Sequence, residues 1–387
     1  MPLAPASPVD LVHELVSFPT VSRDSNLPLI DFVTTYLADL GIESERFESD
    51  DGKKSNLFAT LGGPADVPGI VLSGHTDVVP VDGQDWITDP FNVREKDGKL
   101  FGRGTADMKS FLAICLALAP EIRDARLSEP IHIAFSYDEE IGCRGVGRML
   151  DALKDRSPLP RACIIGEPTS MKVVNAHKGI CAFRTEIVGR EAHSSNTEFG
   201  ESAILAAVRL ISHLNELGEE FKQRGDPSAR FEPPYTSFNI GTLNGGAAIN
   251  IIPNHCAFDW EYRPLPDNDM NEMIDRFSAF SQTVLADMRR NSPEASIQTE
   301  TLAKAPPLMP QEGCPAEELV LRLTGQNETM TAAYATEGGL FQEAGIPAVI
   351  CGPGSIDQAH RPDEFIELSQ IDACVTFIRD LTQALSR

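Results

Sequence analysis

Five side chains in this sequence have the types and the placement of metal ligands. Four of them follow short apolar runs, and one stands at the start of a helical run. They are His75, Asp107, Glu140, Glu167 and His360. Imidazole nitrogens and carboxylate oxygens suit Zn²⁺ and similar divalent ions. Because five ligands are too many for one catalytic zinc ion with an open position, the set predicts two metal ions, bridged by one carboxylate and sharing a water.

Each of these residues alone also has an ordinary structural explanation. Asp107 closes a glycine-rich run and can be interpreted as a helix cap, His75 as a hydrogen-bonded surface histidine, and Glu167 as part of a plain turn. Their joint placement favours a site, because the carboxyl ends of the strands form the crevice of an open α/β sheet. Asp77 lies on the same side of an extended chain as His75 and can orient its imidazole.

Three successive carboxylates, Asp138, Glu139 and Glu140, follow the apolar run 131–135. They repel one another, so a positive charge is expected beside them. Adjacent side chains point in different directions, which allows Glu140 to bind a metal while Glu139 acts as a general base. The alternative is a solvated acidic loop.

The apolar pattern predicts the elements that must position these residues. A capped first helix begins after Ser7, and a helix covers 108–119. A last helix begins at Ser369, which is expected to cap it with Asp372 as its partner in the capping box. Short apolar runs between the helical segments predict buried strands over 70–72, 131–135, 162–165 and 348–351. This alternation predicts an α/β domain with a mainly parallel sheet.

A different pattern begins near His177. Strands and amphipathic helices follow one another in the order β-α-β-β-α-β, which is the ferredoxin-like α+β arrangement. They cover 181–188, 203–217, 237–243, 255–262, 273–288 and 296–302. We therefore predict a discontinuous catalytic domain, 1–177 and 305–387, with an inserted domain over 178–304.

Composition limits the class of protein. The 387 residues include 33 Lys and Arg against 57 Asp and Glu, a net charge of −24, which makes nucleic acids and anionic membranes poor partners. No apolar run is long enough to span a membrane, and the first residues lack the basic and apolar regions of a signal peptide. Eight cysteines without CxxC pairs predict reduced thiols in the cytoplasm. A serine hydrolase lacks support, because no GxSxG string occurs.

Taken together, the strings around these residues resemble the ordered signature of the two-zinc aminoacylase family, which includes succinyl-diaminopimelate desuccinylases and glutamate carboxypeptidases. The resemblance covers nearly the whole chain and rests on Ser73–Pro80, Gly102–Lys109, Asp138–Gly142, Gly166–Pro168 and Ala359–Pro362. It implies a zinc-peptidase-like catalytic domain, an inserted lid and dimerisation domain, and a homodimer. The implied cofactors are two Zn²⁺ ions, with Co²⁺ or another divalent metal able to substitute.

The resemblance also implies a role for each motif residue. Asp107 would bridge the two metals, with His75 and Glu167 completing one site, and Glu140 and His360 completing the other. Glu139 would be the general base, Asp77 would orient His75, and the bond after Asp107 would be cis. In the inserted domain the matching residues are His193, which would polarise the scissile carbonyl across a dimer interface, and Asn250 and Arg263, which would hold the substrate carboxylate.

Within that family, three further strings look like those of the branch that acts on N-acetyl-L-ornithine. They are His177–Gly179, Ala335–Phe341 and Cys351–His360. The expected reaction is hydrolysis to ornithine and acetate, a step of arginine synthesis. Glu337 is the expected partner of the substrate ammonium, with a helix-start carboxylate as the alternative. Rival functions are N-acetylcitrulline deacetylase, succinyl-diaminopimelate desuccinylase, dipeptidase and a non-catalytic metal-binding protein.

Overall fold

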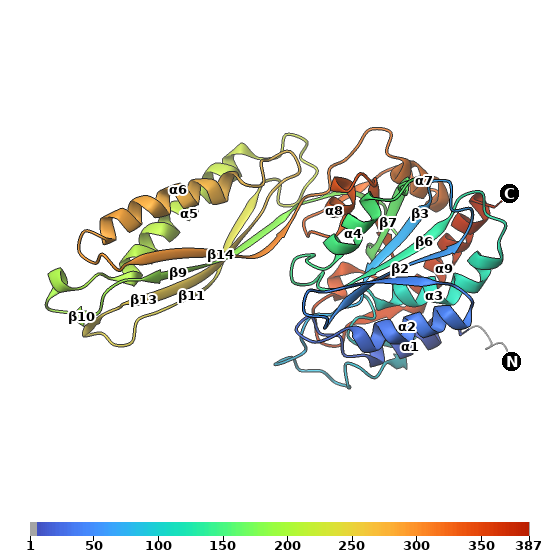
Figure 1. Ribbon diagram of the computed structural model, residues 1–387, viewed down its shortest axis with the longest axis horizontal. Coiled ribbons are helices and arrows are strands. Elements are labelled where there is room, and N and C mark those ends of the chain that lie inside the picture. The colour runs from blue at the N-terminus through green and yellow to red at the C-terminus, as the bar shows by residue number, and fades with distance from the viewer. Residues whose placement is uncertain (1–5, 387) are drawn as a thin grey trace. The chain divides into compact units, whose positions relative to one another are not determined.

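The computed structural model describes residues 6–386, and these form two compact units (Figure 1). The main unit contains residues 6–176, 308–331 and 336–386. The inserted unit contains residues 177–307 together with 332–335. The predicted insertion, 178–304, lies inside these bounds, and only the short segment 332–335 joins the inserted unit from elsewhere in the chain.

An eight-stranded sheet forms the centre of the main unit, in the order β1-β2-β6-β3-β7-β16-β8-β15. Its four central strands are parallel, and β1, β2 and β8 run antiparallel to their neighbours. The bounds are β1 Ser44–Glu48, β2 Ser55–Gly62, β3 Ile70–His75, β6 Ile131–Ser136, β7 Ala162–Pro168, β8 Val174–His177, β15 Met330–Ala332 and β16 Ala348–Gly352. The central strands are covered on both faces, which explains their nearly continuous apolar runs.

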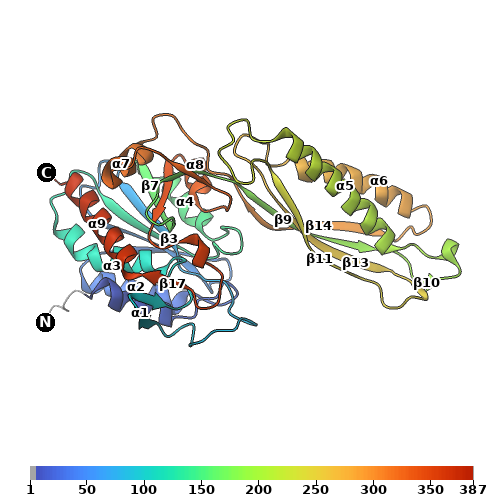
Figure 2. The ribbon, with the colours of Figure 1, turned by 180° about the vertical axis from the view of Figure 1, so that it is seen from behind.

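Helices cover both faces of this sheet (Figures 1 and 2). Helix α3 packs between α1 and α9, and α4 packs against α8. Twelve residues of α3 are buried, because it is the central helix of its layer. The bounds are α1 Pro8–Ser17, α2 Leu27–Asp39, α3 Lys109–Asp124, α4 Val146–Lys154, α7 Pro315–Thr324, α8 Gly338–Glu343 and α9 Leu368–Ala384.

The two predicted helix starts have different outcomes. The Ser7 hydroxyl accepts from the Asp10 amide, and the Asp10 carboxylate accepts from the Ser7 amide, so the predicted capping box is present. Helix α9 begins one residue earlier than predicted, and its N-cap is Glu367 rather than Ser369. The Ser369 hydroxyl instead contacts the Glu367 carboxylate, so the predicted cap is wrong.

A small three-stranded sheet brings two distant segments of the main unit together. It contains β4 Arg94–Lys96, β5 Lys99–Phe101 and β17 Phe365–Glu367, in the order β17-β5-β4. Phe101 is the register partner of Phe365. The glycine-rich loop after β5 therefore lies beside the loop that precedes β17.

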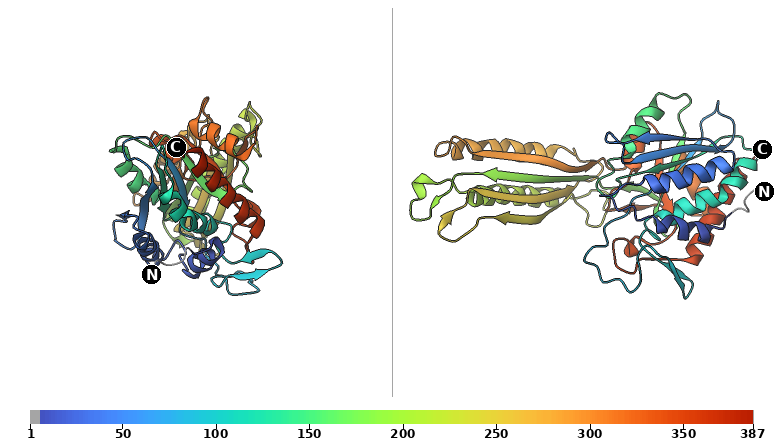
Figure 3. Two further views of the ribbon diagram at one scale, coloured as in Figure 1. Left: turned by 90° about the vertical axis from the view of Figure 1, so that its right-hand side faces the viewer. Right: turned by 60° about the horizontal axis from the view of Figure 1, so that its bottom comes forward.

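The inserted unit has one antiparallel sheet in the order β11-β13-β9-β14, with α5 and α6 packed together over it (Figures 1 and 3). The bounds are β9 Ile180–Val188, α5 Ala203–Arg224, β11 Ser237–Gly245, β13 His255–Arg263, α6 Glu272–Met288 and β14 Ser296–Ala305. Short strands β10 Ala192–His193 and β12 Ile251–Ile252 pair with each other, and the 3-10 turns are η1 Thr197–Phe199 and η2 Ile356–Gln358. The predicted fold class is confirmed. No helix in residues 6–386 has the length and apolarity needed to cross a bilayer.

Candidate metal centre

The five predicted ligands converge in the main unit, although they come from five separate segments. His75 and Glu167 lie at the carboxyl ends of β3 and β7, and Glu140 lies in the turn after β6. Asp107 lies between β5 and α3, and His360 follows η2. The carboxyl ends of neighbouring parallel strands meet at one edge of the sheet, so three of these positions follow directly from the topology.

Asp107 lies at the centre of this cluster, with one histidine on each carboxylate oxygen. Its Oδ1 is 3.1 Å from Nε2 of His75, and its Oδ2 is 3.5 Å from Nε2 of His360. Glu167 Oε1 is 3.6 Å from Nε2 of His75, and Glu140 Oε2 is 3.0 Å from Nε2 of His360. A carboxylate that presents its two oxygens to two separate ligand pairs has the arrangement needed to bridge two ions. The helix-cap alternative for Asp107 is not observed, because α3 begins at Lys109 with Met108 as its N-cap residue.

Asp77 joins the His75 strand to the acidic turn. The nearest partner of the His75 Nδ1 is the Asp77 main-chain carbonyl, at 2.9 Å, while the Asp77 carboxylate lies 3.6 Å away. That carboxylate accepts from the Glu139 and Glu140 amides, at 3.1 and 3.3 Å, and from the Ser22 hydroxyl at 2.7 Å. Asp77 thus leaves His75 Nε2 free for a ligand role and sets the direction of the turn.

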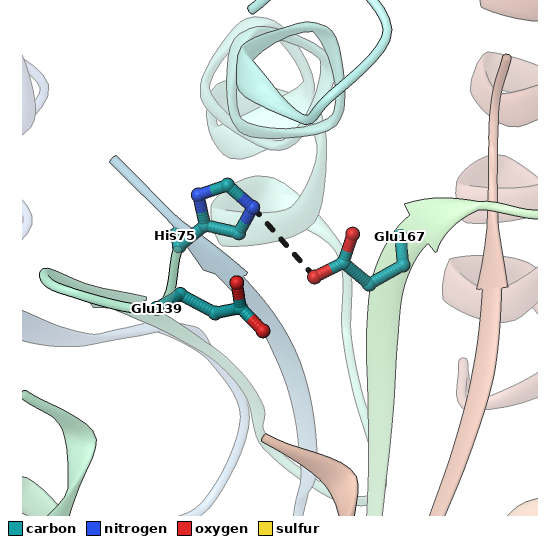
Figure 4. Close-up of side chains that lie close together, drawn as sticks. All are labelled: His75, Glu139 and Glu167. Atoms are coloured by element: carbon teal, nitrogen blue, oxygen red, sulfur yellow. Dashed lines mark ion pairs between the residues drawn. The ribbon is translucent and has the colours of Figure 1, made fainter. Parts of the chain in front are cut away.

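Glu139 points toward His75 and Glu167 (Figure 4). One ligand atom from each of these three residues lies within 4.8 Å of the others. The Cys143 thiol, 3.3 Å away, donates to Glu139 Oε1. Burial raises the pKa of Glu139 well above its ordinary value. A buried carboxylate with a raised pKa is suited to accepting and returning a proton.

The charges of the cluster favour cations. Burial raises the pKa of Glu140 to about 7, and burial together with the nearby Asp107 raises the pKa of Glu167. Hydrogen bonds to Asp107 and Glu140 raise the pKa of His360 to about 10. Two imidazoles and three carboxylates in one buried cluster form a donor set that fits two divalent ions.

The expected positive charge beside the acidic run is Lys54. Its ammonium donates to Asp138 Oδ1 and to the main-chain carbonyl of Ser22. Lys54 lies 84 residues before Asp138, and nothing in the local sequence distinguishes it from a surface lysine. Because Lys54 pairs with Asp138, the two glutamates that follow remain available for chemistry.

Glu337 lies in the main unit at the start of α8, where it is the N-cap residue but makes no side-chain capping bond. It is 1% exposed, and its Oε1 has no hydrogen-bond partner among residues 6–386. Burial raises the pKa of Glu337 to about 7. The side chain is therefore a buried carboxylate with one oxygen uncommitted.

The other three predicted residues lie in the inserted unit, at two different places. His193 is exposed on β10, where its Nδ1 is 2.8 Å from the Ser195 hydroxyl. Asn250 is adjacent, since its carbonyl accepts from the Ser194 amide at 3.0 Å. Arg263 ends β13, and its guanidinium donates to the Glu261 carboxylate through two bonds of 3.0 and 3.3 Å. The sequence did not indicate that Glu261 would engage this guanidinium.

A family model described as Peptidase family M20/M25/M40 matches residues 71–384, which include all five converging ligands. The chain belongs to this family. The predicted resemblance is thereby confirmed, and as an M20 family member the protein is a metal-dependent hydrolase of amide bonds. The Asp107–Met108 peptide bond is cis, as the resemblance implies.

Individual relatives agree with the family assignment. The chain is 35% identical over 376 residues to an acetylornithine deacetylase of Proteus mirabilis, covering 94% of this chain and 93% of the relative. The M20 metallo-carboxypeptidase Sso-CP2 of Sulfolobus solfataricus shares the fold with a TM-score of 0.76 at 17% identity, covering 98% and 99% of the two chains. The Bacillus subtilis YXEP protein, described as a dinuclear metal binding M20 peptidase, has a TM-score of 0.65 at 17% identity, covering 98% and 97%.

Proposed function

We propose that this protein hydrolyses N-acetyl-L-ornithine to L-ornithine and acetate. The observation that carries amide hydrolysis is the Asp107 carboxylate with one histidine at each oxygen and Glu139 beside it. The choice of substrate is supported by the relatives named acetylornithine deacetylase, which align with nearly the entire chain. The reaction would serve arginine synthesis, and eight free, buried cysteines are typical of a reducing cytoplasm.

Two Zn²⁺ ions are the proposed cofactors, with Co²⁺ or another divalent ion able to take the same ligands. His75 and Glu167 would hold one ion, Glu140 and His360 the other, and Asp107 both. When bound, the ions lower the pKa of water and polarise the scissile carbonyl. Distances of 3.0 to 3.6 Å between the imidazole nitrogens and the carboxylate oxygens of these residues support this assignment.

Glu139 is the proposed general base and acid. It accepts one proton from the attacking water, whose oxygen forms a bond to the acetyl carbon. The carbon–nitrogen bond then breaks, and Glu139 delivers the proton to the departing amine. The Cys143 thiol and the Asp77 carboxylate hold the side chain and the main chain of Glu139 during both transfers.

We propose a homodimer, and the positions of the substrate-binding candidates support it. Asn250 precedes β13 by five residues and His193 pairs with the neighbouring strand β12, whereas Arg263 ends the nine-residue strand β13. Eight steps of about 3.3 Å separate the two ends by about 26 Å, so one copy cannot bring both to one small substrate. We assign His193 and Asn250 to the partner's site. Exposed apolar side chains on the inserted unit support such a contact. They include Phe199, Leu205, Val208, Leu243 and Ile249.

Arg263 is the proposed anchor for the substrate carboxylate from the same chain, together with Asn250 from the partner. Guanidinium and carboxylate form two parallel bonds. Glu261 already makes such a contact with Arg263, so the substrate must replace Glu261 or share the guanidinium with it.

Glu337 is the proposed partner of the substrate's δ-ammonium. Replacing Glu337 with glutamine is expected to reduce kcat/KM for N-acetyl-L-ornithine by about 10- to 150-fold, the loss of one charge-assisted hydrogen bond. Uncharged N-acetyl amino acids should be affected much less, because they have no ammonium to bind. The measurement compares N-acetyl-L-ornithine with N-acetyl-L-norvaline, which has the same carbon chain without the amine. An equal loss for both substrates would return Glu337 to a structural role at the start of α8.

The proposed function is tested by measuring, by chromatography, the amino acid that purified protein releases from each substrate. N-acetyl-L-ornithine should be hydrolysed fastest in a panel with N-acetyl-L-citrulline, N-succinyl-diaminopimelate and a dipeptide. A chelator should abolish the release, and added Zn²⁺ should restore it. If another panel member is hydrolysed faster, that compound would become the proposed substrate. Activity that persists after complete removal of the metal would contradict the metal-dependent reaction.

A further inference from the structure

A buried ion pair joins the two loops that carry Asp107 and His360. Arg103 lies in the glycine-rich loop four residues before Asp107, and Glu364 lies four residues after His360. Each is 1% exposed, and Arg103 Nη1 is 2.7 Å from Glu364 Oε2. The pair is therefore out of contact with solvent, directly behind two of the candidate metal ligands.

The Glu364 carboxylate also holds the main chain of the glycine-rich loop. It accepts from the amides of Gly104 at 3.1 Å, Ala106 at 2.8 Å and Asp107 at 3.0 Å. Gly104 has a φ of +86°, so the chain turns sharply here and its amides cannot pair within a helix or strand. One buried carboxylate thus satisfies three main-chain donors and sets the direction from which Asp107 leaves the loop.

Arg103 extends the same network to the His360 loop. Its Nη1 donates to the Arg361 carbonyl at 3.3 Å, and its Nη2 donates to Gln84 Oε1 at 2.6 Å. The Gln84 amide then donates to the His360 carbonyl at 2.9 Å. His360 has a φ of +64°, a conformation that residues other than glycine adopt at a cost and that the surrounding contacts must hold.

Asp77 makes comparable contacts with the acidic turn. Its carboxylate accepts from the amides of Glu139 and Glu140, just as that of Glu364 accepts from the glycine-rich loop. Each carboxylate is buried and fixes one ligand-bearing loop against another. The Asp77 carboxylate lies 3.6 Å from the His75 ring, whereas the Glu364 carboxylate contacts Asp107 through its main-chain amide and reaches the His360 loop through Arg103.

We propose that Glu364 is a positioning residue for the candidate metal centre. With Arg103 and Gln84, it holds Asp107 and His360 at the separation that one metal ion requires. The ion concerned is the one shared by Asp107, Glu140 and His360, so this inference rests on the proposed two-metal function. A stabilising role alone does not explain why the network ends at the main chain of two ligands, and buried ion pairs contribute little net stability.

The test uses the full chain with Glu364→Gln, which keeps the shape of the side chain and removes its charge. Zn²⁺ dissociation constants are measured by competition with a chromophoric chelator. We expect one of two Zn²⁺ ions to bind about 10- to 100-fold more weakly, the usual effect of losing a group that orients metal ligands. The other ion shares Asp107 but not His360, so it should be weakened by a clearly smaller factor, with His75 and Glu167 as its remaining ligands. Arg103→Lys should change the same dissociation constant in the same direction by a smaller factor.

Glu129→Gln is the matched control. Glu129 pairs with Arg161 at 2.5 Å, at the amino ends of β6 and β7 and so at the opposite edge of the sheet. This variant should bind both ions with wild-type affinity. Urea unfolding of each protein without metal separates a change in stability from a change in metal affinity.

Three results are decisive. Wild-type affinity for both ions in Glu364→Gln overturns the positioning role, whatever happens to the stability without metal. Equal weakening of both ions also overturns it, because the loops would then be loosened in general. If Glu364→Gln does not fold, Glu364→Asp is measured instead and judged by the same criteria. This variant keeps the negative charge but shortens the side chain by one methylene, which moves the carboxylate away from the loop amides. A wild-type protein that binds fewer than two ions would contradict the proposed function itself, which is a different outcome.

Discussion

Glu139→Gln is expected to lower kcat for N-acetyl-L-ornithine by about 10²- to 10⁴-fold, the contribution of a positioned general base. Metal content should stay at the wild-type level, because the proposed ligands are other residues and the amide occupies the same space. The raised pKa of the buried Glu139 carboxyl is consistent with a group that holds the proton between two transfers. The measurements are acetate release at saturating substrate and metal content of the same sample.

Glu121→Gln is a suitable control for this variant. Glu121 lies on the exposed side of α3, where it pairs with Arg379 at 2.7 Å, and its loss should leave kcat unchanged. Near-normal turnover by fully metal-loaded Glu139→Gln would remove Glu139 from the mechanism. Loss of one metal together with activity would instead make Glu139 a ligand, as its closeness to His75 and Glu167 permits.

His193→Ala is expected to lower kcat by about 10²- to 10³-fold, the usual loss when one donor to the developing oxyanion is removed. The proposed dimer makes a sharper prediction for mixed proteins. A dimer of one His193→Ala chain and one Glu139→Gln chain has one site with Glu139 from its own chain and His193 from the partner. That site should restore about half of the wild-type activity, although each parent is nearly inactive.

The mixed dimer is isolated through a different affinity tag on each chain, so its formation is measured independently of activity. Dimers of His193→Ala with His193→Ala, carrying the same two tags, are the control and should stay inactive. If purified mixed dimers also stay inactive, His193 acts in its own chain or takes no part, and the assignment of His193 to the partner's site is wrong.

Three of the five candidate metal ligands could be predicted from local structure, because they follow buried parallel strands. His75 and Glu167 end apolar runs that form central parallel strands, and such strand ends meet at one edge whatever the rest of the chain does. The β-α-β-β-α-β order of the inserted unit was accessible for the same reason, since periodicities of 2 and 3.6 residues are local properties. The resemblance to a known family added roles that local patterns leave open, such as the bridging position of Asp107.

Hydrogen-bond and ion-pair partners that lie far apart in the chain could not be predicted from the sequence. The pairing of Glu364 with the amides of the glycine-rich loop spans 257 to 260 residues, and that of Lys54 with Asp138 spans 84. Cap residues were also uncertain: Ser369 lies inside α9, because the preceding strand β17 carries the chain directly into the helix. Such choices depend on which surfaces the folded chain brings together.

Residue types and local patterns were therefore enough to predict a cluster of two histidines and three carboxylates, most of which follow buried strands. The contacts that hold these groups became visible only in the folded chain: a main-chain carbonyl holds His75, Asp77 holds the acidic turn, and Glu364 holds the Asp107 loop. The folded chain also shows that Arg263 is engaged by Glu261 at the far end of β13 from His193. Residue types and periodicities are properties of short segments, so they can be recognised without the fold. A hydrogen bond between residues more than 200 positions apart forms only after the core has packed.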